Sequence, residues 1–304
     1  MLFSFLAVAF VVACACYVYF HFNDFYSVFE ASKFELALAS LFILCSFLAT
    51  CYQLDLFLKR FNLVLGKLEL LAITHAMMLG NLVIPMRGGS GALALYLKKV
   101  HCLDFTAFAV IYGGTAILVA LMSSFFALIA LVSLWILHGY NQFVLIGPVF
   151  VLFVLCLYLT VRAPSFGPRK NFLMDRIVHV ANSWKIIISD TRLVFCLSIA
   201  IALMSLALIG SFFHIYRAIG SSLTLEATVI TSSIGSIVNL APLTPGSLGV
   251  FDVAIIEIQR IMGLTAAKSI AAAIIFRVLT FCLASLIGIP SIVYIYARLK
   301  KAGA

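Results

Sequence analysis

The stretch GNLVIPMRGGSG at residues 80–91 interrupts an apolar segment that runs from about residue 68 to 97. A second stretch, NLAPLTPGSLG at residues 239–249, interrupts another apolar segment, from about 224 to 263. Proline removes a backbone donor and clashes inside a helix, so a helix through either segment breaks near its middle. These breaks decide the fold, because each segment is either a kinked helix or a hairpin that turns back on itself.

The composition places both breaks inside a membrane protein. Of the 304 residues, 64% are hydrophobic and only 10% are charged, whereas soluble domains carry about 25% charged residues. Irregular backbone persists at membrane depth only where protein or water surrounds it. The net charge of +9 is assigned to loops facing an anionic cytoplasmic leaflet, and we expect no nucleic-acid partner.

The uninterrupted apolar runs predict about six full transmembrane helices, since one span needs about 20 apolar residues. They lie at about 2–20, 36–56, 105–136, 142–161, 193–213 and 268–297. The first run lacks a basic region and an obvious cleavage site, so we expect a retained span and not a secretory signal.

Positive charge favours two re-entrant hairpins over two kinked spans. With a cytoplasmic N-terminus, fourteen of the 20 basic residues then lie on the cytoplasmic side, in 57–67, 98–104, 162–192 and 298–304. If the first broken segment crossed, the basic residues of 162–192 would move outside, against the positive-inside rule. We therefore expect both termini in the cytoplasm and a location in the plasma (inner) membrane.

This order makes the second half an inverted repeat of the first. The predicted fold is an all-α polytopic membrane protein with six spans and two hairpins. It is one domain, 1–304, with halves 1–137 and 138–304. Both breaks contain Pro-x-x-x-Gly-Ser, with Asn81 or Asn239 shortly before the proline.

A polar connector at 162–192 joins the halves. Apolar residues at helical spacing predict an amphipathic helix on the cytoplasmic membrane surface. Packing beneath the bundle is a compatible alternative. We expect Tyr112, Gly113 and Gly114 to permit close helix contact in preference to binding a ligand.

Ionisable residues deep within apolar segments are costly and by default mark function, and four of them are singled out here. Arg87 lies at the first break and Arg277 in the last span, while Asp252 and Glu257 follow the second break. Arginine forks suit phosphate. Two alternatives stay open: Arg277 pairs with Asp252 or Glu257 to lock the fold, or Arg87 reaches cytoplasmic water.

New helices are expected to start after each break, near Ser90 and near Ser247. Free amides and the positive dipole end at a helix start favour an anion. Inverted-repeat transporters place their substrates between such broken helices near the midplane.

The two breaks also resemble the motifs of one family. The pattern Asn81-x-x-x-Pro85-x-Arg87-x-Gly89 resembles the first motif of the lysylphosphatidylglycerol synthase transmembrane-region family. The stretch PLTPGSLGVFD at 242–252 resembles its second motif, and FRVL at 276–279 its last helix. The resemblance implies a flippase-like bundle that handles a lipid with a phosphate-bearing head.

The chain departs from this family pattern at two carboxylates. Gly89-Ser90 stands where Gly-Glu is frequent, and Asp252 stands where glutamate is usual. The resemblance therefore does not imply a strictly symmetric charge mechanism. It also does not imply the lipid head group that other members of the family handle. No soluble transferase domain follows Lys301, so we expect no lysyl transfer by this chain.

The leading hypothesis is a translocase for an anionic phospholipid or a polyprenyl-phosphate-linked glycolipid. The expected substrate-binding residues are Arg87, Arg277, Asn81, Ser90, Asn239, Thr244, Ser247 and Asp252. The residues expected to shape the hairpins are Pro85, Gly89, Pro242, Pro245, Gly246 and Gly249. No cofactor or metal is expected. Alternatives are an integral-membrane enzyme or an accessory subunit of a cell-envelope lipid or glycan pathway, which would have a partner enzyme.

Overall fold

The computed structural model describes residues 31–139, 143–162, 182, 184–185, 187–221, 223–240 and 244–302. Every secondary-structure element in this part of the chain is a helix. Five helices are long and apolar enough to cross a membrane. They are α3 (Lys33–Arg60), α6 (Phe105–His138), α7 (Phe143–Val161), α9 (Thr191–Ala218) and α12 (Ala266–Ala302).

These five helices confirm five of the expected spans. Two of them have side-chain N-caps: in α3 the Ser32 hydroxyl accepts from Glu35 N–H at 3.5 Å, and in α9 the Asp190 carboxylate accepts from Leu193 N–H at 3.0 Å. Such caps satisfy backbone donors that have no partner inside the helix. The sixth expected span, 2–20, lies outside the described residues.

Both broken segments form pairs of short helices. Hairpin 1 consists of α4 (Lys67–Val83), the 3-10 turn η2 (Pro85–Arg87) and α5 (Gly88–His101). Hairpin 2 consists of α10 (Leu225–Val238), the 3-10 turn η3 (Pro245–Ser247) and α11 (Val250–Ile261). In each pair the two helices pack against one another.

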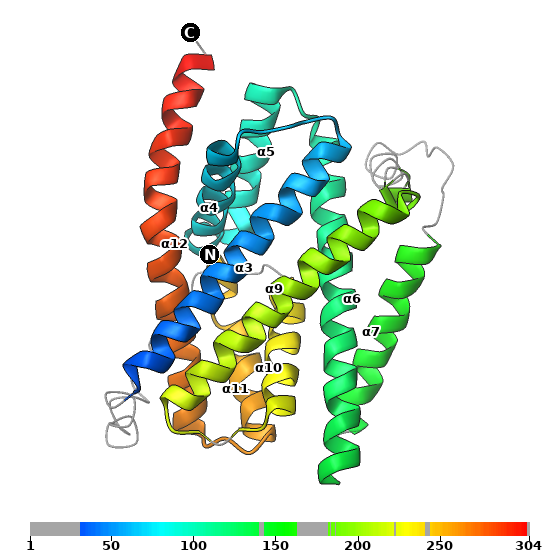
Figure 1. Ribbon diagram of the computed structural model, residues 1–304, viewed down its shortest axis with the longest axis vertical. Helices are drawn as coiled ribbons and strands as arrows, with labels where there is room; N and C mark the ends of the chain where they lie inside the picture. Colours follow the sequence, from blue (N-terminus) through cyan, green and yellow to red (C-terminus); the bar gives the residue numbers. More distant parts are fainter. Residues whose placement is uncertain are drawn as a thin grey trace.

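The hairpins occupy opposite halves of the molecule, and their tips meet near its centre (Figure 1). Hairpin 1 lies in the half that contains the end of α12, and hairpin 2 lies in the half where α12 begins. Turn η3 contacts both α4 and η2. The two irregular turns therefore lie against one another, although η2 keeps an exposed side, where Met86 is 77% exposed.

The helices pack in a pattern that is nearly symmetric between the two halves. Helix α3 packs along α9, α4 packs on α12, and α10 packs on α6. Each hairpin therefore leans on the last long helix of the other half. Gly288 of α12 permits one of these contacts, since a Cβ there would lie 2.8 Å from Leu79 Cβ.

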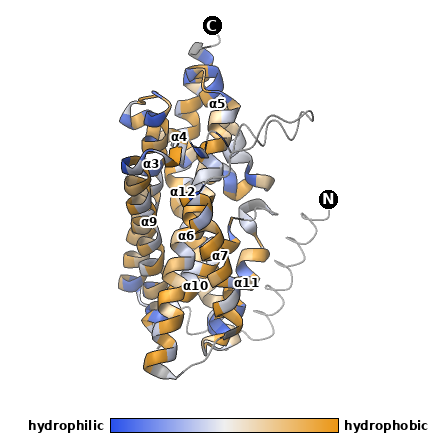
Figure 2. Cartoon of the chain, turned by 90° about the vertical axis from the view of Figure 1, so that its right-hand side faces the viewer, coloured by the Kyte–Doolittle hydropathy of each residue, from blue (hydrophilic) through white to orange (hydrophobic). Residues whose placement is uncertain are grey.

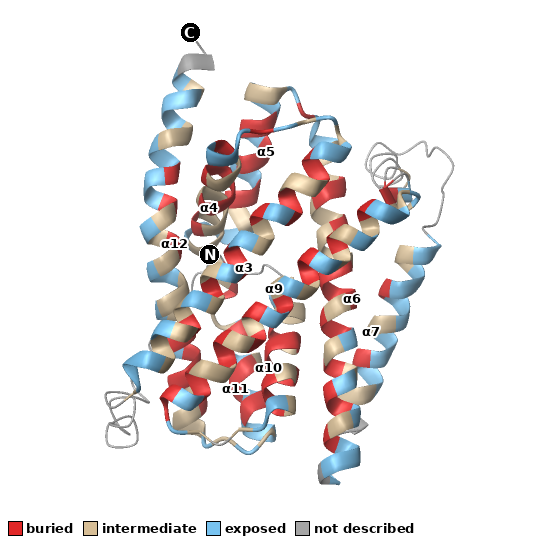
Figure 3. Ribbon diagram, in the orientation of Figure 1, coloured by how far each residue is buried: buried red, intermediate tan, exposed pale blue. Residues whose placement is uncertain are grey.

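Apolar side chains cover the outside of the bundle as well as its interior. Hydrophobic residues dominate the helices in Figure 2, and exposed positions alternate with buried ones along α12 in Figure 3. Leu286 and Tyr296 of α12 are 73% and 70% exposed. Exposed apolar surface of this extent marks contact with lipid.

Charges gather at the two ends of the bundle. At the end where α3, α5 and α12 finish, which we call the basic end, the side chains include Lys59, Arg60, Lys98, Lys99 and Lys300. The opposite end is mixed, with Glu257 paired to Arg260 at 2.9 Å. This asymmetry resembles that of membrane proteins with one cytoplasmic face.

The described part of the 162–192 connector packs into the bundle. Trp184 and Ile187 are buried in its largest hydrophobic cluster, and the Trp184 indole N–H donates to Leu159 O at 3.1 Å. A Cβ on Gly114 would lie 2.3 Å from the Trp184 ring, so Gly114 does permit a close contact. Most of the predicted amphipathic helix lies outside the described residues.

Candidate functional site: a cavity between the hairpin tips

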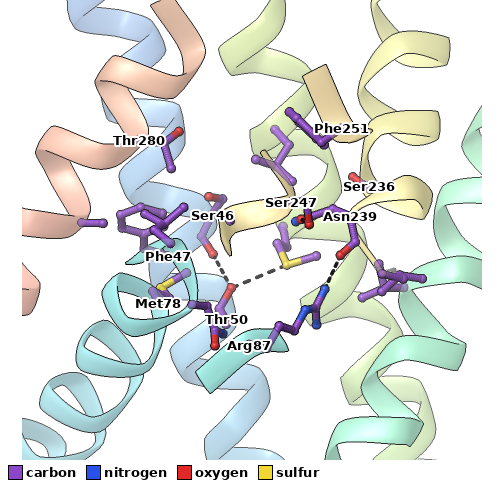
Figure 4. A pocket seen from close by; sticks show the side chains of 18 of the residues that line it. Ser46, Phe47, Thr50, Met78, Arg87, Ser236, Asn239, Ser247, Phe251 and Thr280 are labelled. Atoms are coloured by element: carbon purple, nitrogen blue, oxygen red, sulfur yellow. Dashed lines mark hydrogen bonds between the residues drawn. The ribbon is translucent and has the colours of Figure 1, made fainter. Parts of the chain in front are cut away.

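A cavity of about 310 Å³ lies where the two hairpin tips meet. Its walls come from α3, α4, α6, α9, α10, α11 and α12, and from both 3-10 turns. Residues from both halves of the chain therefore face one shared space, as Figure 4 shows for ten labelled side chains. Cavities of about 300–1,000 Å³ are typical of small-molecule sites.

Asn81 fixes the tip of hairpin 1. Its Oδ1 accepts from Ser90 N–H at 2.9 Å, and its Nδ2 donates to Ser90 Oγ at 3.0 Å. Gly89 makes this approach possible, because a Cβ there would lie 2.2 Å from Met77 O. Pro85 begins the 3-10 turn that reverses the chain.

Arg87 extends from the tip of hairpin 1 to hairpin 2. Its guanidinium donates to the Tyr112 hydroxyl oxygen and to the Asn239 carbonyl oxygen, the latter marked in Figure 4. The guanidinium carbon also lies 5.3 Å from the centre of the Tyr112 ring. Two of the five N–H groups of an arginine are thus engaged. This placement brings the side chain to the cavity wall between the tips.

Hairpin 2 has a tip bond like that of hairpin 1. The Ser247 hydroxyl donates to Asn239 Oδ1 at 2.9 Å, as the shared Asn and Gly-Ser elements suggest. Thr244 Oγ1 donates to Leu248 O at 2.6 Å. Pro245 begins the turn, and Gly246 and Gly249 have φ of 56° and 86°, which glycine adopts readily. Pro242 lies outside the described residues.

Arg277 of α12 clamps the tip of hairpin 2 from the side. Its Nε donates to Asp252 Oδ1 at 2.7 Å, and its Nη2 donates to Asp252 Oδ2 at 3.1 Å. Nη1 donates to Gly246 O at 2.6 Å. Asp252, which is 3% exposed, also accepts from Gly249 N–H at 3.0 Å. Asp252 and Glu257 were both considered as partners of Arg277, and the structure pairs Arg277 with Asp252.

The expected site residues fall into two groups. Arg87, Arg277, Asn81, Asn239, Thr244 and Ser247 line the cavity, whereas Ser90 and Asp252 are not among its lining residues and hold these side chains in place. The expectation that α5 and α11 start near Ser90 and Ser247 is met to within three residues. Helix α5 begins at Gly88, before the serine, and α11 begins at Val250, after it. Arg87 and Gly249, which both have positive φ, stand directly before the two helices.

Glu257 does not belong to this site. It pairs with Arg260 at the exposed opposite end and does not reach Arg277. Asp252 and Glu257 therefore do not form the neighbouring carboxylate pair on which the enzyme alternative depends.

Sequence reasoning missed several cavity residues. Tyr112 was expected to serve helix packing only, but its hydroxyl accepts from Arg87 and its side chain lines the cavity. The other missed residues are single polar side chains on apolar helices, which form no motif. They are Ser46, Thr50 and Gln53 on α3, Thr115 on α6, Ser232 and Ser236 on α10, and Thr280 on α12.

The cavity wall carries a net positive charge. Arg277 is balanced by Asp252, while the two hydrogen-bond acceptors of Arg87 are neutral, a phenol and a carbonyl oxygen. No Asp or Glu is among the described residues that line the cavity. An unbalanced arginine in an apolar bundle favours an anionic ligand.

The fold and the cavity together define an all-helical integral membrane protein. The tips of two helical hairpins in this protein meet at a cavity that both halves of the chain line. The family model described as the lysylphosphatidylglycerol synthase TM region matches residues 2–288, and the chain belongs to this family. Among curated proteins, none matches the chain.

Proposed function

We propose that the protein translocates an anionic phospholipid or a polyprenyl-phosphate-linked glycolipid, with the lipid head between the two hairpin tips. The observation that carries the proposal is the unbalanced charge of Arg87 in a cavity shared by both halves. Family membership supports it, since a phosphate-bearing lipid is what the family's sequence motifs led us to expect.

The proposed membrane arrangement is an inverted repeat. Hairpin 1 would enter from the basic end and hairpin 2 from the opposite end, with six spans around them. The basic end would face the cytoplasm, because basic residues are retained on that side, and both termini would lie there in the plasma membrane. The nearly symmetric packing of α4 on α12 and of α10 on α6 supports this arrangement.

The mechanism assigns different tasks to the two arginines. Arg87 would hold the phosphate, while Asn81, Asn239 and Ser247 hydrogen-bond the rest of the head. Arg277 would keep hairpin 2 closed through Asp252 until a phosphate competes for the guanidinium. The acyl or prenyl chains would stay in lipid, so the bilayer barrier is lowered only for the polar head.

Head-group translocation in proteoliposomes tests the proposal. Arg87→Gln removes the unbalanced charge and should lower translocation of an anionic lipid at least tenfold, since charge-assisted bonds to phosphate are about twice as strong as neutral ones. Arg260→Gln is the matched control, because Arg260 lies at the opposite end beside Glu257. If the wild type is no faster than protein-free vesicles, the proposal is wrong.

A further inference from the structure

A second polar cluster lies at the basic end and joins hairpin 1 to α12. Its centre is Glu69, in the first turn of α4, whose side chain is 4% exposed. Glu69 Oε1 accepts from the Tyr96 hydroxyl at 2.5 Å and from His101 Nε2 at 2.8 Å, and Oε2 accepts from the Arg298 guanidinium. None of these four residues lines the cavity between the tips, so the cluster is a separate feature.

The cluster connects elements from both halves of the chain. Tyr96 and His101 lie on α5, so their bonds to Glu69 hold the two helices of hairpin 1 together at its base. Arg298 lies near the end of α12, so its bond to Glu69 attaches this base to a helix of the other half. The contact between α4 and α12 continues as close packing around Gly288. Packed helices can slide past one another by small shear movements, whereas an ion pair holds them at one position.

The charge on the hairpin side of this ion pair depends on His101. Imidazole is the side chain that changes its charge between about pH 5 and pH 8. When His101 is neutral, its Nε2–H still donates to Glu69, and the carboxylate leaves the hairpin side with a negative charge that attracts Arg298. When His101 is protonated, this negative charge is cancelled and two cations share one carboxylate. Three donors favour the ionised form of Glu69 in both cases. Protonation of His101 therefore weakens the attraction between hairpin 1 and α12.

The neighbouring ionisable groups are of types that do not supply this response. At the basic end of hairpin 1 and of the helices packed on it, the described groups are carboxyls, phenols, ammonium groups and guanidinium groups, which ordinarily titrate outside this pH range. They are Lys67 of α4, Lys98 and Lys99 of α5, Asp55, Lys59 and Arg60 of α3, Asp104 before α6, and Tyr294 and Lys300 of α12. The other histidine of hairpin 1, His75, is 2% exposed and donates to Leu71 O of its own helix at 2.8 Å, with Cys51 Sγ of α3 at 4.0 Å.

We propose that Glu69, His101 and Arg298 form a proton-sensitive latch, which holds the base of hairpin 1 on α12 at neutral pH and releases it when His101 binds a proton. Tyr96 keeps the carboxylate in place in both states, because its hydroxyl donates whatever the charge of His101. The latch goes beyond the proposed function and does not rest on it, since it concerns the position of a hairpin and involves no lipid.

The distance between hairpin 1 and α12 tests the latch. Spin labels are placed at Leu95→Cys on α5 and Ala297→Cys on α12, two exposed and uncharged positions, in the purified full chain with the eight native cysteines replaced. Double electron–electron resonance in detergent gives the distribution of distances at about pH 7.5 and at about pH 5.5, on either side of the imidazole titration. We expect one main distance at the higher pH. At the lower pH the population with a longer distance should rise about threefold, which is the size of effect that a partly exposed ion pair has.

Three variants locate the response. His101→Gln keeps a hydrogen-bond donor but binds no proton, so the main distance should stay the same at both pH values, and His101→Asn replaces this variant if it does not fold. Arg298→Gln removes the cation on α12, so the longer distance should be populated at both pH values. His214→Gln is the matched control, because His214 donates to Glu35 at 2.6 Å beside Arg217 in a similar cluster between α3 and α9. It should keep the full response to pH.

Three results would overturn the latch. The first is a wild-type distance that is the same at both pH values or that shortens at the lower pH. The second is a response to pH that persists in His101→Gln, because the proton then binds to another group. The third is a response that is lost in His214→Gln, because the change then belongs to the whole bundle and not to hairpin 1. The measurement contains no transported lipid, so none of these results decides the proposed function.

Discussion

Arg277 and Asp252 form a buried ion pair whose geometry is suited to holding a turn closed. The guanidinium lies 4.7 Å from the Phe251 ring centre and also donates to the backbone of η3. Removing one member of a buried pair leaves an uncompensated charge, whereas removing both does not. The pair is therefore expected to behave as one structural unit.

Asp252→Ala should lower the free energy of unfolding by about 3 kcal/mol, because Arg277 is then left partly buried without its carboxylate. Adding Arg277→Met should recover part of this loss. Thermal unfolding in a fixed detergent measures both. A double variant that loses as much as the two single variants together would show that the pair does not act as a unit.

At the residue scale, the sequence identified the conspicuous positions. Arg87 and Arg277 stand out because charge is rare in apolar segments, and Asn81 and Asn239 stand out because they repeat beside proline. Gln53 and Tyr112 could not be identified in this way. A polar residue on an apolar helix can face lipid, a neighbouring helix or a cavity, and only packing decides among these.

At the scale of elements, hairpin 1 depends on the close approach of α4 and α5. A Cβ on Gly89 would lie 2.6 Å from Asn81 N, and a Cβ on Gly80 would lie 2.7 Å from Gly89 Cα. Both obstacles are backbone atoms, which cannot rotate aside. The sequence predicted a role for Gly89 in the shape of the hairpin, but the register of α5 against α4 required the structure.

Gly89→Ala should destabilise the protein by about 3 kcal/mol through overpacking. Gly91→Ala is the matched control in the same helix, since no heavy atom outside the helix's own backbone lies within 4 Å of a Cβ there. Alanine at that position should stabilise α5 by about 0.5–1 kcal/mol, because glycine is costly in helices. The denaturation midpoints of the two variants give the comparison. Equal losses of stability in Gly89→Ala and Gly91→Ala would contradict the close approach of α4 and α5.

At the scale of the whole molecule, helices from the two halves of the chain pack against each other in pairs that no single segment of the sequence predicts. Helix α4 packs on α12 and α10 packs on α6, so each half completes the other. The hydropathy pattern predicted the long helices and the breaks, because burial in lipid imposes length and apolarity. It could not predict which distant helices pair, since that depends on the shapes of their surfaces.

The central claim is that a lipid head passes between the two hairpin tips. A Cβ on Gly246 would lie 3.3 Å from Leu82 Cα, so the two tips are in contact at these positions and a bridge between cysteines placed there would hold them together. The measurement is head-group translocation of phosphatidylglycerol by Leu82→Cys/Gly246→Cys in proteoliposomes, with the eight native cysteines replaced. We predict that the bridged protein translocates no faster than protein-free vesicles and that a reductant restores the rate. Equal rates before and after reduction, with the bridge shown to form, would contradict the account.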